Sequence, residues 1–360
     1  MTEEMRAMVL SECKKIEEKP LRLTKIEKHS ISNPDEVLIK IEACGVCHSQ
    51  LHGIEGDWQE IGIPPNLPTV PGHEVVGKIV EIGSDVKKYK VGDTVAVGVM
   101  VDSCMECDQC KKNEEQLCRD TFTQTYNTPD RIDKTMTYGG YSKHIVTREE
   151  FVLNIPDTLD ISRAAPILCA GITTYTPLRE NKVGPGSRVG VMGLGGLGHM
   201  AVKLAVAMGA NVTALTTSKN KSQMGLDIGA HKVLVVSDTE KMKEAAKSLD
   251  LIINTVPVKH DINKYIPLLD IRGEMVIVGQ FGSLENFTTM PMVFGNNKLS
   301  LSVIGGIKMT QELLNFCAEH NIHPECEIIK MDQINDAFNR LAKAEVSGRL
   351  VIDMSSLKME

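Results

Sequence analysis

A glycine-rich stretch near the middle of the chain constrains the fold most. Residues 190–198 read Gly-Val-Met-Gly-Leu-Gly-Gly-Leu-Gly. A short apolar run ends at Met192, and His199–Met208 carries apolar residues at helical spacing after the glycines. This order of strand, Gly-x-Gly-x-x-Gly turn and helix is typical of a dinucleotide-binding unit. Taken alone, the motif also fits a packing turn without a ligand.

Each glycine of the motif has a predicted role in such a turn. Gly193 permits the tight turn, Gly195 lets the backbone approach a pyrophosphate, and Gly198 lets helix and strand pack closely. The N-terminus of the following helix offers free N–H groups to the phosphates. The predicted cofactor-binding turn consists of Gly193, Leu194, Gly195, Gly196, Leu197 and Gly198.

Short apolar runs alternate with helical stretches after about Pro156. The runs are Arg188–Met192, Asn211–Leu215, Val233–Val236, Leu251–Ile253, Met275–Val278 and Leu299–Ile304. Strands that alternate with helices in this way predict a doubly wound parallel sheet of the Rossmann type, and hence an α/β fold.

The first 155 residues differ, because short β-branched runs and Gly-Asp or Gly-Ser turns dominate there. The clearest runs, Val37–Ile41, Val75–Ile82 and Val91–Val99, predict a mostly β, barrel-like catalytic domain. After residue 305 the alternation stops, and two helices and a strand are expected to return to this first domain. The predicted domains are therefore 1–158 with 300–360 for catalysis, and 159–299 for the dinucleotide.

Bulk composition excludes several classes of protein. The chain of 360 residues exceeds what one core usually holds, so two domains are expected. A net charge of −7 with scattered basic residues argues against a nucleic-acid surface. The N-terminus lacks a basic-then-apolar signal pattern, and no apolar run reaches the ~20 residues that span a bilayer. We therefore expect a cytoplasmic protein with neither nucleic-acid nor membrane partners.

Four of the ten cysteines lie within one short segment. Cys104, Cys107, Cys110 and Cys118 follow the pattern Cys-x2-Cys-x2-Cys-x7-Cys. In a chain of this size without a signal peptide, such clustering is more typical of metal binding than of disulfides. Four thiolates suit tetrahedral Zn²⁺ and leave no open position, which predicts a structural site. An iron–sulfur cluster and free cysteines are the alternatives.

Several short sequence motifs resemble those of one protein family, and they occur in the family's order along nearly the whole chain. They are Ala43–Ser49, Val70–Gly77, Val91–Asp93, the four-cysteine segment, Gly139–Ser142, Leu168–Thr173, Gly193–His199 and Val351–Asp353. On these motifs the chain resembles the zinc-dependent medium-chain alcohol dehydrogenases, and most of all their cinnamyl alcohol dehydrogenase branch. The resemblance implies a GroES-like fold for the mostly β domain.

The resemblance also implies a second, catalytic zinc ion held by Cys47, His73 and Cys169. Glu74, beside His73, would be a carboxylate able to approach the metal when water or substrate exchanges. Each residue alone is a weak signal, since a lone cysteine usually behaves as a small core residue. Two thiolates and one imidazole leave an open coordination position, as catalytic zinc requires. With the four-cysteine segment, two zinc ions per chain are expected.

The same resemblance assigns a proton relay to Ser49 and His52. Ser49 would bond the substrate oxygen and hand a proton through the ribose hydroxyl to His52. Histidine suits the surface end of a relay, because imidazole titrates near neutral pH. Ser49, His52 and Glu74 form the predicted catalytic group.

The end of the second Rossmann-type strand predicts which nucleotide binds. NAD-binding folds carry Asp or Glu about 20 residues past the glycines, where it bonds the ribose hydroxyls. Here no acid is present, and hydroxyls and a lysine stand instead: Thr216, Thr217, Ser218 and Lys221. These can bind a 2′-phosphate, which a carboxylate would repel, so NADP(H) is predicted. The family resemblance adds Thr173, Thr255 and Gly279 to the predicted cofactor site.

Two departures from the family concern Gln50 and the substrate pocket. The family usually has Asp where Gln50 stands, as a partner of the metal-binding histidine. An amide can orient His73 but lacks the charge that raises ligand basicity, so we expect an altered Lewis acidity or pH profile. The cinnamyl branch carries Trp where this chain has Thr123. The predicted pocket residues are Trp58, Phe122 and Thr123, and Trp58 is expected on a loop over Gly53–Leu67.

Together these features predict a zinc-dependent, NADP(H)-linked dehydrogenase of primary alcohols and aldehydes, with broad specificity that includes aromatic or cinnamyl substrates. A polyol or secondary-alcohol dehydrogenase of the same superfamily and a non-catalytic NADPH-binding protein are the alternatives. Many relatives pair through the edges of their Rossmann sheets, and by this analogy a homodimer with its seam at Leu299–Ile304 is expected. The alternative is that this apolar sixth strand is covered by its own chain.

Overall fold

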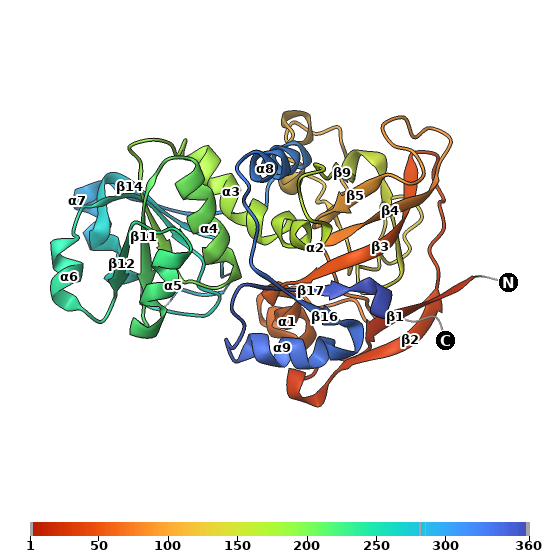
Figure 1. Ribbon diagram of the computed structural model, residues 1–360, viewed down its shortest axis with the longest axis horizontal. Coiled ribbons are helices and arrows are strands. Elements are labelled where there is room, and N and C mark those ends of the chain that lie inside the picture. The colour runs from red at the N-terminus through yellow and green to blue at the C-terminus, as the bar shows by residue number, and fades with distance from the viewer. Residues whose placement is uncertain (1–2, 281, 285, 358–360) are drawn as a thin grey trace. The chain divides into compact units, whose positions relative to one another are not determined.

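The computed structural model describes residues 3–280, 282–284 and 286–357, and the chain divides into two compact units (Figure 1). The first unit comprises Met1–Cys169 with Gly305–Glu360, and the second comprises Ala170–Ile304. The boundaries expected from the sequence lay at 158/159 and 299/300. Among the described helices, none combines the length and the apolar character needed to cross a bilayer.

The second unit is built on a six-stranded parallel sheet with the order β12-β11-β10-β13-β14-β15. Its strands are β10 (Arg188–Met192), β11 (Asn211–Thr216), β12 (Lys232–Val235), β13 (Leu249–Asn254), β14 (Leu269–Ile277) and β15 (Lys298–Leu301). The strand order reverses between β10 and β13, as in a doubly wound dinucleotide fold. The predicted Rossmann-type fold class is therefore confirmed.

Helices cover this parallel sheet because its strands carry apolar residues on both faces. Met192, Ile252 and Met275 pack on one face against the short turns at Ile262–Lys264 and Ile266–Leu268. Helix α4 packs on β10 and β11, α5 and α6 pack on β12, α7 packs on β14, and α3 packs against α4. The bounds of these helices are α3 (Ala170–Glu180), α4 (Gly196–Ala207), α5 (Ser222–Asp227), α6 (Thr239–Glu244) and α7 (Met290–Gly295).

The first unit is mostly β, as expected, and its main sheet has the order β16-β17-β3-β4-β5-β9, with β8 also paired to β3. These strands are β3 (Glu36–Val46), β4 (Val75–Ile82), β5 (Thr94–Val97), β8 (His144–Arg148), β9 (Leu153–Asn154), β16 (Cys326–Lys330) and β17 (Arg349–Asp353). Two small sheets join β1 (Glu4–Leu10) to β2 (Leu21–Glu27) and β6 (Met100–Asp102) to β7 (Thr123–Gln124). The C-terminal segment returns to this unit, because β17 runs antiparallel to β3.

Within the described residues of the first unit, the α-helices that accompany the sheet are α1 (His48–Glu55), α2 (Ile161–Ala164), α8 (Ile307–Glu319) and α9 (Ile334–Ala342). In α9, Ile334, Ala337 and Phe338 are buried, which is the i, i+3, i+4 spacing of one helix face. Contacts of α9 with α1 hold α1 in place directly after β3. This arrangement matters because α1 begins at one of the predicted metal ligands.

Two sequence-based assignments differ from the structure for local backbone reasons. Only Thr94–Val97 of the run Val91–Val99 is a strand, because Gly92, at φ +96°, makes a turn that leaves Val91 57% exposed. The stretch around Trp58 is not a plain loop. Gly56 ends α1 with a left-handed φ of +79°, and a 3-10 turn over Asp57–Ile61 follows.

Candidate active site

Four predicted residues, distant in sequence, meet in the first unit. Cys47 is the N-cap of α1, His73 and Glu74 directly precede β4, and Cys169 follows the 3-10 turn Ala165–Leu168. One donor atom from each residue lies within 4.8 Å of the others, and all four residues are buried. The structure thus brings together the three expected ligands and their neighbouring carboxylate.

The donor set fits a tetrahedral zinc ion. The Sγ atoms of Cys47 and Cys169 are 3.6 Å apart, and two sulfurs at a Zn–S distance of 2.3 Å stand about 3.8 Å apart in a tetrahedron. Nε2 of His73 is buried, with no hydrogen-bond partner in the described part of the chain. Buried polar atoms are normally satisfied, and a metal ion would satisfy this one.

Glu74 is held by a buried ion pair with Arg349, the first residue of β17. The Glu74 carboxylate is fully buried and Arg349 is 5% exposed. Burial raises the pKa of Glu74, and the Arg349 guanidinium opposes that effect. The carboxylate also lies against Gly45, where an added Cβ would come within 1.8 Å of Glu74 Oε2. Removing one partner of a buried ion pair typically lowers the free energy of unfolding by about 3–5 kcal/mol. The pair with Arg349 therefore holds the Glu74 carboxylate beside the predicted metal ligands.

The two predicted relay residues lie three positions apart on α1, and hence on one face of the helix. The Ser49 hydroxyl donates to Cys47 Sγ at 3.1 Å. His52 Nδ1 lies 2.8 Å from Asp57 Oδ2, and its side chain is 24% exposed. Asp57 carried no sequence signal of its own.

Gln50 does not take the position expected from the sequence. Its Oε1 accepts hydrogen bonds from the Cys47 N–H at 2.9 Å and from the Tyr141 hydroxyl at 2.6 Å. Its Nε2 is buried without a partner among the described residues. The expectation that Gln50 orients His73 is therefore corrected: as the third residue of α1, its side chain folds back onto the N-cap.

The aromatic residue beside the metal ligands is one that the sequence did not single out. The Tyr126 ring lies nearly parallel to the His73 ring, with centroids 6.1 Å apart and planes at 13°. Thr123 is buried in β7, and Trp58 lies with its ring centroid 6.2 Å from that of His52. The assignment of Trp58, Phe122 and Thr123 to a substrate pocket stays a prediction.

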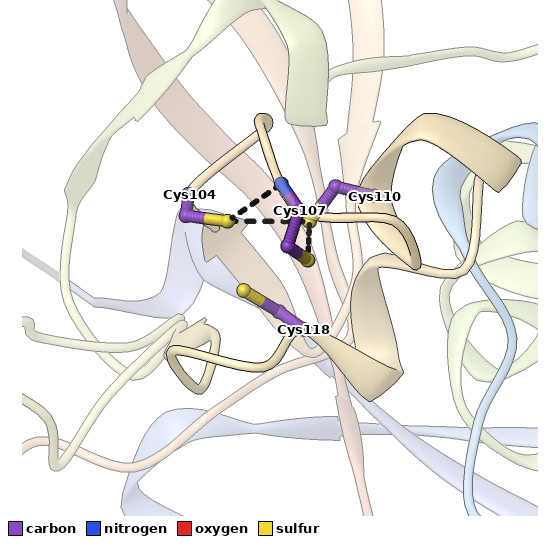
Figure 2. Close-up of side chains that lie close together, drawn as sticks. All are labelled: Cys104, Cys107, Cys110 and Cys118. Atoms are coloured by element: carbon purple, nitrogen blue, oxygen red, sulfur yellow. Dashed lines mark hydrogen bonds between the residues drawn. The ribbon is translucent and has the colours of Figure 1, made fainter.

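The four-cysteine segment forms a second candidate metal site, shown in Figure 2. The Sγ atoms of Cys104, Cys107, Cys110 and Cys118 lie within 4.8 Å of one another. Cys110 Sγ is 3.8 Å from Cys104 Sγ and 3.5 Å from Cys107 Sγ. Such separations fit four thiolates around one zinc ion, with no position left for a substrate.

We expect Cys110→Ser to lower the zinc content by one ion per chain and the unfolding midpoint by about 5–10 °C, while kcat of the folded fraction is retained. The reason is that this donor set binds metal only to order its own loop. Elemental analysis and calorimetry measure the two effects. Cys317→Ser is the control, because Cys317 is buried but belongs to neither cysteine cluster. A large loss of kcat without a change in the unfolding midpoint would contradict a structural role.

In the second unit, the glycine-rich turn leaves room for a ligand at one position. The tight turn requires glycine at 193, where φ is +85°. Close packing requires glycine at 198, where a Cβ would lie 2.0 Å from Gly193 O. Gly195 is exposed, and a Cβ there would meet no atom of the described chain within 4 Å. Packing does not require glycine at 195, whereas approach of the backbone to a pyrophosphate does.

Other predicted cofactor residues gather at the same end of the sheet. Thr255 follows β13, and its hydroxyl donates to Met192 O at 2.7 Å. A Cβ on Gly279 would come within 2.4 Å of the Thr255 carbonyl carbon. These residues lie beyond the carboxyl ends of β10, β13 and β14, where the strand order reverses and ligands of such sheets bind. Thr173 lies on α3 and is buried.

The end of β11 carries hydroxyl groups and no carboxylate. Thr216 is the last residue of the strand, and its Oγ1 accepts the Ser218 N–H at 3.2 Å. Thr217 is exposed, and Lys221 is half-buried in the 3-10 turn Lys219–Lys221. The chemistry of this strand end suits a phosphate group better than ribose hydroxyls alone.

Comparison with known proteins agrees with both units. Residues 33–157 match the family described as "Alcohol dehydrogenase GroES-like domain", and residues 196–319 match "Zinc-binding dehydrogenase". The chain is 48% identical over 340 residues to NADP-dependent alcohol dehydrogenase C 1 of Mycolicibacterium smegmatis, covering 94% of this chain and 96% of that relative.

Two solved structures are also similar over nearly the whole chain. A cinnamyl alcohol dehydrogenase from Sorghum bicolor has a TM-score of 0.92 and 37% identity, with 99% of each chain covered. CAD from Helicobacter pylori, solved in complex with NADP(H), has a TM-score of 0.89 and 36% identity, again with 99% of each chain covered. The chain belongs to the zinc-dependent alcohol dehydrogenases, with a GroES-like domain and an NADP(H)-binding Rossmann-type domain.

Proposed function

We propose that this protein interconverts primary alcohols and aldehydes with NADP(H), at a zinc ion held by Cys47, His73 and Cys169. The observation that carries the proposal is the buried donor cluster, in which these residues and Glu74 place donor atoms within 4.8 Å. When bound, zinc supplies a Lewis acid for the substrate oxygen, and NADPH supplies the hydride. A non-catalytic role is disfavoured, because a chain without catalysis would be expected to lose zinc ligands, and both clusters contain all of their predicted donors.

The residues of α1 would move the proton. The Ser49 hydroxyl lies beside Cys47 Sγ, and there it would hydrogen-bond the oxygen of a substrate bound next to Cys47. His52 donates its Nδ1–H to Asp57, which leaves Nε2 as the nitrogen that exchanges a proton. With a side chain 24% exposed, His52 can pass that proton to solvent. Asp57 thus fixes the His52 tautomer.

Aldehydes with an apolar or aromatic substituent are the proposed substrates. The Tyr126 ring lies parallel to the His73 ring, so an aromatic surface borders the metal ligands. Burial, and to a smaller extent the nearby Cys47 and Cys169, raise the pKa of Tyr126, so its hydroxyl stays neutral and can donate a hydrogen bond. We include cinnamyl-type aldehydes among broad substrates rather than as a strict preference, because Thr123 stands where that branch has Trp.

A panel of aliphatic and aromatic aldehydes, assayed with NADPH and with NADH, tests this proposal. We expect reduction of several aldehydes with NADPH, a clear preference over NADH, and loss of activity after treatment with a strong chelator. Secondary alcohols and polyols, assayed with NADP⁺, are expected to react much more slowly. Absence of turnover with every aldehyde would refute the proposal, and faster turnover of polyols would favour a polyol dehydrogenase.

We also propose that the protein is a homodimer joined through β15. This strand is an edge of the second unit's sheet, with Leu301 72% exposed, and Phe294 on the adjacent segment is 86% exposed. Large apolar side chains on an open sheet edge are a liability unless another chain covers them. None of the ten cysteines forms a disulfide, which is compatible with the cytoplasmic location that we propose.

Phe294→Asp is expected to halve the molar mass measured by light scattering, because a buried carboxylate would oppose the apolar seam. The matched control is Leu226→Asp on α5, which packs on β12 at the opposite edge of the sheet. That variant should keep the mass of the unmodified protein. A Phe294→Asp protein with unchanged mass would exclude this seam.

A further inference from the structure

Tyr141 connects two segments that carry proposed metal ligands. Its hydroxyl donates to Gln50 Oε1 at 2.6 Å, and its backbone N–H donates to Pro71 O at 2.9 Å, two residues before His73. The residue is completely buried, and its ring packs against Phe338 of α9, with centroids 6.3 Å apart. The phenol therefore has a fixed position relative to the His73 segment.

Close backbone pairing makes that position rigid. Gly139 N–H donates to Val70 O at 2.8 Å, and Gly140 N–H donates to Gly72 O at 2.9 Å. A Cβ on Gly72 would lie 2.6 Å from Gly140 N, so the two segments approach as closely as only glycine allows. The segment that ends at His73 cannot shift without moving Tyr141.

On the other side, Gln50 passes the constraint to Cys47. Gln50 Oε1 accepts the Cys47 N–H at 2.9 Å as well as the Tyr141 hydroxyl. Because Gln50 Nε2 is buried without a partner in the described chain, the amide is oriented through its oxygen alone. Without the Tyr141 hydroxyl, the Gln50 amide would be held only by its hydrogen bond from the Cys47 N–H.

We propose that Tyr141 is a positioning residue of the catalytic metal site, which acts through Gln50 to set Cys47 relative to His73. This rests on the proposed function, in which Cys47 and His73 bind the metal. Hydrogen bonds behind the ligands hold them in the bound geometry, and their loss typically costs about 10–100-fold in metal affinity. The link runs to the backbone of Cys47 and involves no charged group.

The test is the rate at which Tyr141→Phe releases zinc to a chromogenic chelator. We expect one of the two zinc ions per chain to leave about tenfold faster than in the unmodified protein, while the other leaves at an unchanged rate. The matched control is Tyr89→Phe, which removes a buried hydroxyl of the same unit that donates to Val152 O at 2.8 Å. A general loss of stability would affect both variants, whereas selective release would affect Tyr141→Phe alone.

A double-mutant cycle tests whether the effect passes through Gln50. In a Gln50→Leu background, Tyr141→Phe should not accelerate zinc release further. Equal release rates from Tyr141→Phe and Tyr89→Phe, or additive effects of Gln50→Leu and Tyr141→Phe, would overturn the inference. A protein from which Cys47→Ser removes no zinc would instead refute the proposed function, because the Cys47 cluster would then hold no metal, so the two failures are distinguishable.

Discussion

Cys47→Ser is expected to remove one of the two zinc ions and to lower kcat/KM for aldehyde reduction by at least about 10³-fold. Cys47 contributes a donor atom to the open cluster, and its Sγ lies 3.6 Å from that of Cys169. A serine oxygen is a poorer ligand for zinc than a thiolate and reaches less far. Elemental analysis and the absorbance of NADPH measure the two effects.

Cys44→Ala is the control for this variant. Cys44 lies three residues before Cys47 and is equally buried, yet it lies outside the donor cluster. Its sulfur is packed on β3, where a Cβ on Gly140 would come within 2.5 Å of it. This variant should keep both zinc ions and most of the activity. Loss of zinc from Cys44→Ala with retention in Cys47→Ser would reassign the ligand.

How far the sequence predicts a metal site depends on how local the site is. The four-cysteine segment spans fifteen positions, Cys104–Cys118, so its spacing alone indicates metal binding. Cys47, His73 and Cys169 share no local spacing, because β3, β4 and the turn before α3 must fold before they meet. Only the family resemblance could single out these three residues.

The residues that support the ligands could not be found from the sequence. Arg349 pairs with Glu74 across 275 residues of chain, and Tyr141 bonds Gln50 across 91. Neither pairing leaves a periodic or spaced pattern, because both depend on how β17 and the Gly139–Tyr141 segment lie against the sheet. The prediction that Gln50 orients His73 is wrong for the opposite reason. The Gln50 side chain makes a local contact with the N-cap of α1 in place of the expected long-range contact with His73.

The alternating part of the fold was easier to predict than the mostly β part. Buried parallel strands are short apolar runs, and all six runs contribute to the strands β10–β15. In the first unit, the run predicted at Val91–Val99 is longer than the observed strand Thr94–Val97. The strand begins only after the turn at Gly92, which has a left-handed φ. Such backbone conformations depend on the turn as a whole and not on apolar patterning.

Thr216→Asp is expected to lower kcat/KM with NADPH by about 10²-fold, which corresponds to about 2.7 kcal/mol, while kcat/KM with NADH is kept or rises. Thr216 ends β11, the position at which a carboxylate bonds ribose hydroxyls in NAD-binding folds. A carboxylate there would repel a 2′-phosphate. It would still accept the Ser218 N–H, as Thr216 Oγ1 does at 3.2 Å, and would lose only the longer hydrogen bond that Thr216 Oγ1 donates to Ser218 O at 3.4 Å.

The control is Thr216→Asn, which has nearly the size of Asp and keeps an acceptor for Ser218 N–H but carries no charge. Thr216 is 5% exposed, so both variants meet the same crowding, and a difference between them reports the charge. The measurement is the ratio of kcat/KM with NADPH to that with NADH, which cancels changes in the amount of active protein. An equal fall of this ratio in both variants would mean that shape, not charge, selects the nucleotide. An unchanged ratio in Thr216→Asp would mean that the 2′-phosphate lies away from the end of β11.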